Sequence, residues 1–162
     1  MLNKNIIKRY VFLSLSIMIA VLIFWFSHQT ASVSSDESEG LIWNVLNFIP
    51  YFARMADSVK LEIIDNVHTL VRKTAHFSIY AALGICVFNY IITYISAKKK
   101  ALLFSVGICF LYACTDEIHQ LFVEGRSGEV RDVFIDTCGA LTGICFVLVT
   151  AHFILKVRRC KK

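Results

Sequence analysis

The sequence predicts an all-α integral membrane protein, a bundle of about four transmembrane helices with an interfacial amphipathic segment between the first and second spans. Its residues are 57% hydrophobic, and the mean hydropathy is +0.63, which is too apolar for a soluble domain. Four segments come close to the roughly 20 apolar residues that a span needs. The basic residues stand in short clusters beside these segments, so the net charge of +5 indicates membrane topology and no nucleic-acid partner.

The first span is expected at residues 10–26. Basic residues precede it, as they precede the apolar part of a signal peptide. However, residues 24–26 are Phe-Trp-Phe, where a cleavage site would need small residues. We therefore expect the segment to stay in the protein as a membrane helix.

The segment between the first two spans divides into three parts. Residues 27–40, SHQTASVSSDESEG, are expected to form a polar loop. Residues 41–52, LIWNVLNFIPYF, are apolar but short and contain a proline, which favours a place in the membrane interface. From residue 57 to residue 71 apolar residues recur at helical spacing, which predicts an amphipathic lead-in to the second span.

The remaining spans are expected at residues 74–97, 101–123 and 132–157, in one domain over residues 1–162. Of the 17 lysines and arginines, 11 lie on the side of the chain ends and six on the other side, which predicts cytoplasmic termini. All 12 carboxylate residues fall on the outer half, which indicates function there. The six cysteines have no metal-ligand spacing, and we expect them to be small, buried and unpaired.

Polar residues of three spans are predicted to lie at one depth. Counted at about 1.5 Å per residue from the nearest cytoplasmic lysine, His76, His119 and Asp136 lie about 33, 28 and 30 Å above it. This is close to the thickness of the hydrocarbon core, about 30 Å. A polar site is therefore expected at the outer end of the bundle.

The faces of the helices agree with this placement. Residues at helical spacing form one polar stripe on each span, and small residues after the last stripe would let helices approach closely. The short connector VEGRSGEVR would bring Arg126 back over the site. The stripes are Arg72, His76 and Tyr80; Tyr112, Asp116, His119 and Gln120; and Asp132 and Asp136, which lead into Gly139, Ala140 and Gly143.

Two interpretations of these ionisable residues stay open. Charged groups near lipid usually face a partner or a cavity, which favours a functional site. Alternatively, Arg72, Lys73, Arg126 and Arg131 would only neutralise Asp116, Asp132 and Asp136 in a structural ion-pair network.

Three stretches of the sequence resemble the VanZ-like family of bacterial membrane proteins. They are FSHQTAS at residues 26–32, RKTAHFSIYAALG at 72–84 and DEIHQLFVEGRSGEVRDVFIDTCGALTG at 116–143. The resemblance implies a multi-pass protein of the bacterial cytoplasmic membrane that is associated with resistance to teicoplanin and related lipoglycopeptides. The resemblance assigns a catalytic role to none of these residues. The positions that match the family pattern are Arg72, Lys73, His76, Tyr80, Asp116, Glu117, His119, Gln120, Arg126, Asp132, Asp136 and Gly139.

Binding of an amphiphile at the outer leaflet is the first functional hypothesis. The ligand would be a membrane lipid, a lipoglycopeptide or a lipid-linked cell-wall precursor. Arginine and lysine side chains would contact its phosphate or carboxylate, with Tyr80, Glu117, Gln120 and Asp132 as further ligand-binding candidates.

An acid–base enzyme acting on a lipid headgroup is the second hypothesis. His76 or His119 would be the general base, and Asp116 or Asp136 would orient it. No cofactor is evident, but a divalent metal would be compatible with this chemistry, held by Asp116, Glu117, Asp132 and Asp136. A small transporter or a structural envelope protein is the third possibility.

Overall fold

The computed structural model describes residues 4–160 and is all-α over that range. Its helices are α1 (Lys4–His28), α2 (Ala31–Phe48), α3 (Pro50–Ala53), α4 (Asp57–Ile91), α5 (Lys98–Gln120) and α6 (Val130–Cys160). Four of them, α1, α4, α5 and α6, are long and apolar enough to cross a membrane. The chain is therefore a multi-pass membrane protein with four candidate spans, as predicted.

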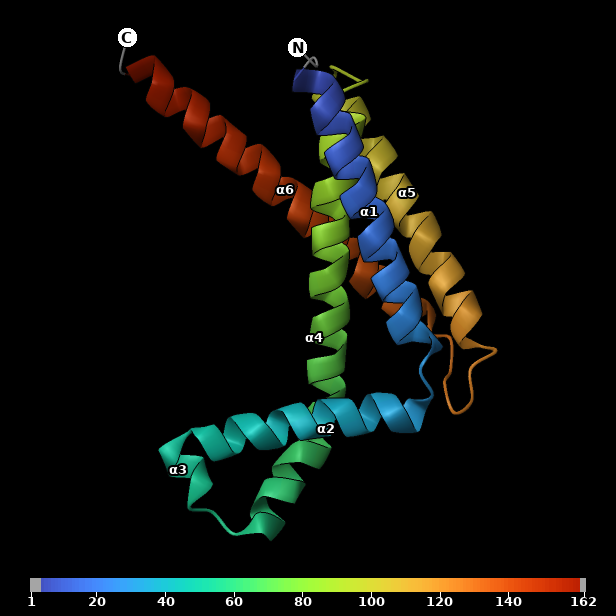
Figure 1. The fold of residues 1–162 in the computed structure, drawn as a ribbon, viewed down its shortest axis with the longest axis vertical. Coiled ribbons are helices and arrows are strands. Elements are labelled where there is room, and N and C mark those ends of the chain that lie inside the picture. The colour runs from blue at the N-terminus through green and yellow to red at the C-terminus, as the bar shows by residue number, and fades with distance from the viewer. Residues whose placement is uncertain (1–3, 161–162) are drawn as a thin grey trace.

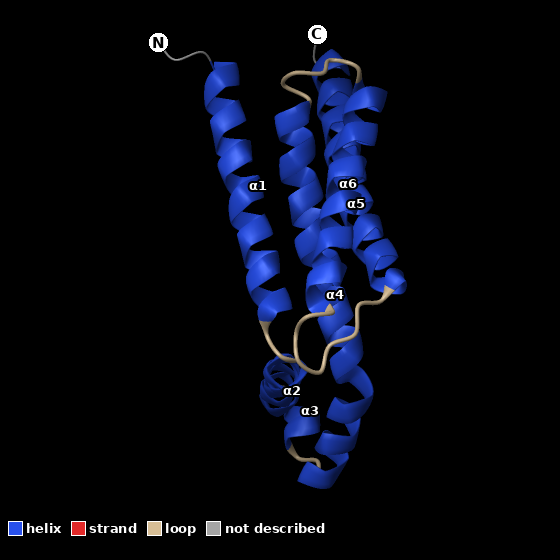
Figure 2. Ribbon diagram, turned by 90° about the vertical axis from the view of Figure 1, so that its right-hand side faces the viewer, coloured by secondary structure: helices blue, strands red, loops and turns tan. Residues whose placement is uncertain are grey.

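Helix α4 stands at the centre of the bundle and contacts α1, α2, α5 and α6 (Figure 1). The two ends of the chain lie at one end of the bundle, while α2, α3 and the α5–α6 connector lie at the other (Figure 2). An even number of spans requires this arrangement. That the end carrying the termini faces the cytoplasm stays a prediction from the basic residues.

Glycines hold α4 and α6 close together. A Cβ at Gly139 would meet the backbone carbonyl of Phe77, and one at Gly143 would meet the carbonyl of Ala81. Where the helices continue past each other, Gly84 of α4 lies against the backbone of α6 in the same way. The predicted close approach at the small residues of the last span is confirmed. It places the start of α6 directly beside the middle of α4.

The predicted polar loop over residues 27–40 is wrong, because residues 31–40 form the first half of α2. Serines and a glycine gave this segment a low intrinsic helix propensity. However, Ser38, Ile42 and Leu46 recur every four residues, and all three are buried. The last two pack with Ile64 of α4 in one apolar cluster, so tertiary packing decides the structure here.

The predicted lead-in is continuous with the second span, and the resulting α4 has 35 residues. At about 1.5 Å per residue it is roughly 52 Å long, well beyond a 30 Å hydrocarbon core. Its first half therefore extends past the spans and packs with α2 and α3, an assembly called the arm below (Figure 1). The arm contains the segment expected in the interface. The second span ends at Ile91, earlier than the expected residue 97.

Two cysteines do not have the predicted environment. Cys86 and Cys109 are buried and Cys114 is half-buried, but Cys138 and Cys145 are exposed. They lie on a face of α6 that no other helix covers, and apolar sequence alone does not tell a lipid-facing position from a buried one. These five thiols are free. The side chain of Cys160 lies outside the described residues.

Candidate functional site

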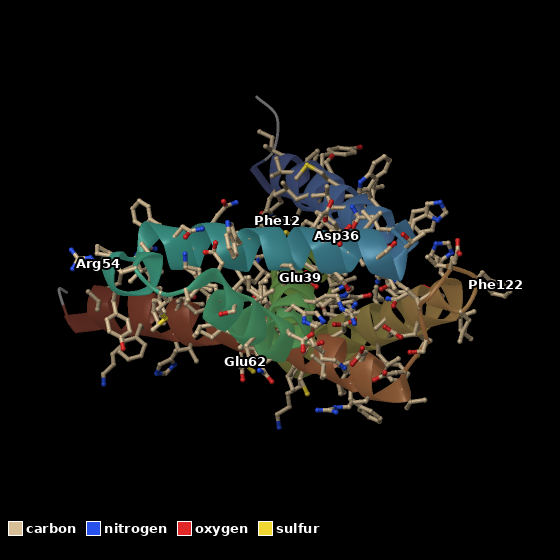
Figure 3. The ribbon with its side chains drawn as sticks, turned by 90° about the horizontal axis from the view of Figure 1, so that it is seen from below. Phe12, Asp36, Glu39, Arg54, Glu62 and Phe122 are labelled. Carbon is tan, nitrogen blue, oxygen red and sulfur yellow. The ribbon has the colours of Figure 1, made fainter. Side chains whose placement is uncertain are left out.

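A polar cavity of about 80 Å³ lies where α4, α5, α6 and the α5–α6 connector meet. It is at the end of the bundle next to the arm. Seen from that end, Asp36 and Glu39 lie on α2 and Glu62 lies on α4 (Figure 3). Eight of the sequence-predicted site residues line the cavity: Arg72, Lys73, His76, Glu117, Gln120, Arg126, Asp132 and Asp136.

Helical spacing explains how these side chains reach one space. Arg72 and His76 are four residues apart on α4, so they lie on one face, and Asp132 and Asp136 have the same spacing on α6. The connector returns after Gln120 and places Arg126 above them, as the sequence predicted.

The inner side of the cavity holds an imidazole and two carboxylates. One ligand atom from each of His76, Asp116 and Asp136 lies within 4.8 Å of the other two. His76 Nδ1 is 3.9 Å from Asp136 Oδ2, which is beyond hydrogen-bond distance. Asp136 is 1% exposed and Asp116 is 4% exposed. Neither oxygen of Asp136, nor Oδ1 of Asp116, has a hydrogen-bond partner among the described residues.

The second oxygen of Asp116 is held in place. Ser27 donates a hydrogen bond from Oγ to Asp116 Oδ2 at 2.8 Å, and Gln120 Nε2 lies 3.4 Å from the same oxygen. Ser27 is completely buried at the end of α1. Side chains of α1 and α5 therefore fix the position of this oxygen.

Two of the cavity cations have partners in the protein. Lys73 Nζ is 2.5 Å from Asp132 Oδ1 and 3.5 Å from Glu129 Oε2. Arg126 donates to the backbone carbonyls of Gln29, at 2.8 Å, and Phe26, at 3.0 Å, which ties the connector to the end of α1. Burial, followed by the charge of the neighbouring Arg72, lowers the pKa of the Arg126 guanidinium.

Arg72 is different from these two cations. No hydrogen bond or ion pair joins its guanidinium to another group within residues 4–160. The predicted network is thus present for Lys73 and Asp132. It does not extend to Arg72, Asp116 or Asp136. Arg131 is exposed and lies outside the cavity.

His119 is not brought together with His76. Its ring lies 4.6 Å from the ring of Phe24, and its Nε2 lies 3.3 Å from His28 Nδ1. The cavity lining does not include it. Tyr80 lies one helical turn further along α4 than His76; it is completely buried, and its hydroxyl has no partner within the described part of the chain.

Three contributors were missed by sequence reasoning. Ser27 and Gln29 come from the end of the first span, and Glu129 comes from the connector. The run SHQT directly after the apolar first span could have indicated Ser27 and Gln29. Polar residues at that end of the span lie in the same layer as the polar cluster, so their side chains can reach the cluster.

An apolar groove of about 320 Å³ adjoins the polar cavity between α1, α2 and α4. Arg72 and His76 line both spaces, so they form the wall between them. The other residues along the groove are mostly apolar: Ile23, Phe26, Gln29, Ser34, Glu37, Ser38, Leu41, Val71, Ala75 and Ile79.

Comparison with known proteins gives one result. The model of the VanZ/LLP1 family matches residues 12–153, a range that includes every residue of the polar cavity. No curated protein and no solved structure matches the chain.

Proposed function

The chain belongs to the VanZ/LLP1 family, and we propose that it binds an anionic amphiphile, with the charged headgroup in the polar cavity and the chain in the apolar groove. The observation that carries the proposal is the wall of Arg72 and His76 that the two spaces share. A ligand lying across it would be polar at one end and apolar at the other. Membrane lipids, lipoglycopeptides and lipid-linked cell-wall precursors have this character.

Arg72 would be the anchor for the headgroup. Its guanidinium has no partner in the described chain, and guanidinium binds phosphate or carboxylate through two parallel hydrogen bonds. Lys73 and Arg126 already have acceptors and would mainly contribute positive charge.

Size supports a division of the ligand between the two spaces. Sites for drug-sized ligands have volumes of about 300–1,000 Å³. The polar cavity, at about 80 Å³, is large enough only for a compact charged group. The groove, at about 320 Å³, reaches the lower end of that range and would take part of an acyl chain.

We propose that the site faces the outside of the cell. With cytoplasmic termini, the cavity would open at the outer face of the bacterial cytoplasmic membrane. Binding there would let the protein capture an incoming lipoglycopeptide or its lipid-linked target, and we propose that it lowers susceptibility to teicoplanin-type drugs in this way.

Lipid binding by the purified protein tests this function. An anionic and a neutral amphiphile with the same acyl chains are compared by native mass spectrometry. Arg72→Gln should weaken binding of the anionic one by about tenfold or more, corresponding to the loss of a charged hydrogen bond. Arg131→Gln, a change outside the cavity, is the control and should have no effect. Equal loss in both variants, or no preference for the anionic amphiphile, would contradict the proposal.

Hydrolysis or transfer at the headgroup is a second candidate function. The observation in its favour is His76, whose Nδ1 lies 3.9 Å from the buried carboxylate of Asp136, which has no hydrogen-bond partner in the part of the chain that the structure describes. His76 would accept a proton from water, Asp136 would stabilise the resulting imidazolium, and Arg72 would stabilise negative charge on the substrate. Turnover of a bound phospholipid that stops in His76→Gln, with binding retained, would support this chemistry over binding alone.

A further inference from the structure

We propose that His76, Asp116 and Asp136 form a divalent-cation site at the inner end of the polar cavity. The inference goes beyond headgroup binding, because a cation would occupy this position whether or not an amphiphile is present.

The three ligands come from three different helices, α4, α5 and α6, and converge on one point. Their nearest ligand atoms lie within 4.8 Å of one another. In a tetrahedral site with metal–ligand distances near 2.1 Å, ligand atoms are about 3.4 Å apart. The 3.9 Å between His76 and Asp136 would shorten by about half an ångström, and a pair separated by as much as 4.8 Å would shorten by about 1.4 Å, which side-chain rotations can supply.

Unpartnered carboxylate oxygens point to a missing positive group. Asp136 is 1% exposed and Asp116 is 4% exposed, and within residues 4–160 neither oxygen of Asp136 nor Oδ1 of Asp116 has a hydrogen-bond partner. Buried carboxylates are stable only when they are paired, protonated or bound to a metal. The lysine and arginine side chains nearby have other acceptors or lie free in the cavity, so they do not fill this role.

The polar neighbours of Asp116 resemble the outer shell of a metal site. Ser27 donates to Asp116 Oδ2 at 2.8 Å, and Oδ1 is left without a hydrogen-bond partner among the described residues. Ligating carboxylates are commonly oriented by such hydrogen bonds.

Charge balance is consistent with a divalent ion. The carboxylates around the cavity outnumber the cations by two, which is the charge that one such ion would neutralise. The carboxylates are Asp116, Glu117, Glu129, Asp132 and Asp136, and the cations are Arg72, Lys73 and Arg126.

The ligand set indicates the class of metal. One imidazole nitrogen with two carboxylate oxygens suits Zn²⁺ or Mn²⁺, whereas Mg²⁺ and Ca²⁺ prefer oxygen ligands only. Three protein ligands leave positions open for water or an anion. Because His76 and Asp136 line the cavity, these positions would face the proposed headgroup space.

Metal titration of the purified full-length protein tests the site. After treatment with a chelator, binding of Zn²⁺ and Mn²⁺ is measured by calorimetry, and the melting temperature is followed in parallel, because a ligand of the folded state raises it. One cation per chain is expected, with weaker binding of Mg²⁺ and Ca²⁺. His76→Gln, Asp116→Asn and Asp136→Asn should each reduce affinity by about 100-fold or more.

Asp132→Asn is the matched control. It removes another carboxylate of the same cavity, one that already pairs with Lys73, and should change the affinity by no more than about threefold. An equal loss in Asp132→Asn would show that binding depends on general negative charge and would overturn the site.

Absence of Zn²⁺ and Mn²⁺ binding by the folded wild type would overturn it as well. If an aspartate variant fails to fold, His76→Gln decides the question, because His76 is half-buried and borders open space. Wild-type affinity in His76→Gln would refute the assignment.

Discussion

The contact between α4 and α6 gives a prediction whose size follows from the structure. In Gly143→Ala, the added Cβ would collide with the backbone carbonyl of Ala81, and the carbonyl carbon would be only 2.8 Å away. A collision with backbone is not relieved by turning a side chain, so the helices must separate. Overpacking of this kind costs about 1–3 kcal/mol. Replacement of a helical glycine by alanine gains about 1 kcal/mol.

The net expectation for Gly143→Ala is a loss of up to about 2 kcal/mol in the free energy of unfolding. For a chain of this length that corresponds to a fall of up to about 6 °C in Tm. Separation of the helices should also move His76 away from Asp136 and weaken ligand or metal binding. Gly139→Ala should behave alike, because its Cβ would meet the carbonyl of Phe77.

Gly107→Ala is the matched control. Gly107 lies within α5, and a Cβ there would meet nothing within 4 Å. It should keep or raise the Tm, measured for all variants in one detergent or by reversible unfolding in bicelles. If Gly143→Ala and Gly107→Ala melt at the same temperature, the close approach of α4 and α6 is not what positions the site.

Three further outcomes are expected. His119→Ala should leave lipid and metal affinities within about twofold of wild type, because its ring packs on Phe24 outside the cavity; a loss as large as that of His76→Gln would contradict this. Lys60→Met should destabilise the arm by about 1–3 kcal/mol and speed its proteolysis, since Lys60 is 4% exposed and donates to Asn47 at 2.9 Å; unchanged proteolysis would refute it. In a variant with Cys160 as its single cysteine, an impermeant thiol reagent should label broken but not intact cells, and labelling of intact cells would reverse the predicted topology.

The sequence was sufficient for the spans and for predicting that His76 and Asp136 lie in one layer. Apolar length predicts four membrane helices, and helical rise from the basic clusters places His76 and Asp136 in the same layer. Both inferences depend on distances along a single helix, which the residue count determines. The small residues Gly139 and Gly143 likewise predict a close helix crossing, because few other arrangements need residues without side chains.

The rotation of each helix was less predictable. On α5, Asp116, His119 and Gln120 form one stripe by spacing, but at about 100° per residue His119 and Gln120 point about 100° apart. The cavity lies on the side of Gln120 and Glu117, so His119 turns to α1 instead. Neighbouring helices decide which edge of a wide polar stripe faces inward. The same holds for Ser27, whose role depends on where α5 packs.

The two interpretations of the polar cluster, functional site and structural ion-pair network, differ in whether its carboxylates should have partners within the protein. A charged side chain costs about 2.5–3.5 kcal/mol at the centre of a membrane helix, and less toward the interface. In a structural network, an ion-pair partner would offset this cost for each carboxylate, as Lys73 does for Asp132 at 2.5 Å. Asp136 is more deeply buried, neither of its oxygens receives a hydrogen bond within the described chain, and His76 Nδ1 lies 3.9 Å from Oδ2. Its burial lowers the stability of the empty fold. This favours a binding site over a structural network, and we propose that Asp136 contributes through what the site binds, whether that is a cation, a proton or a headgroup.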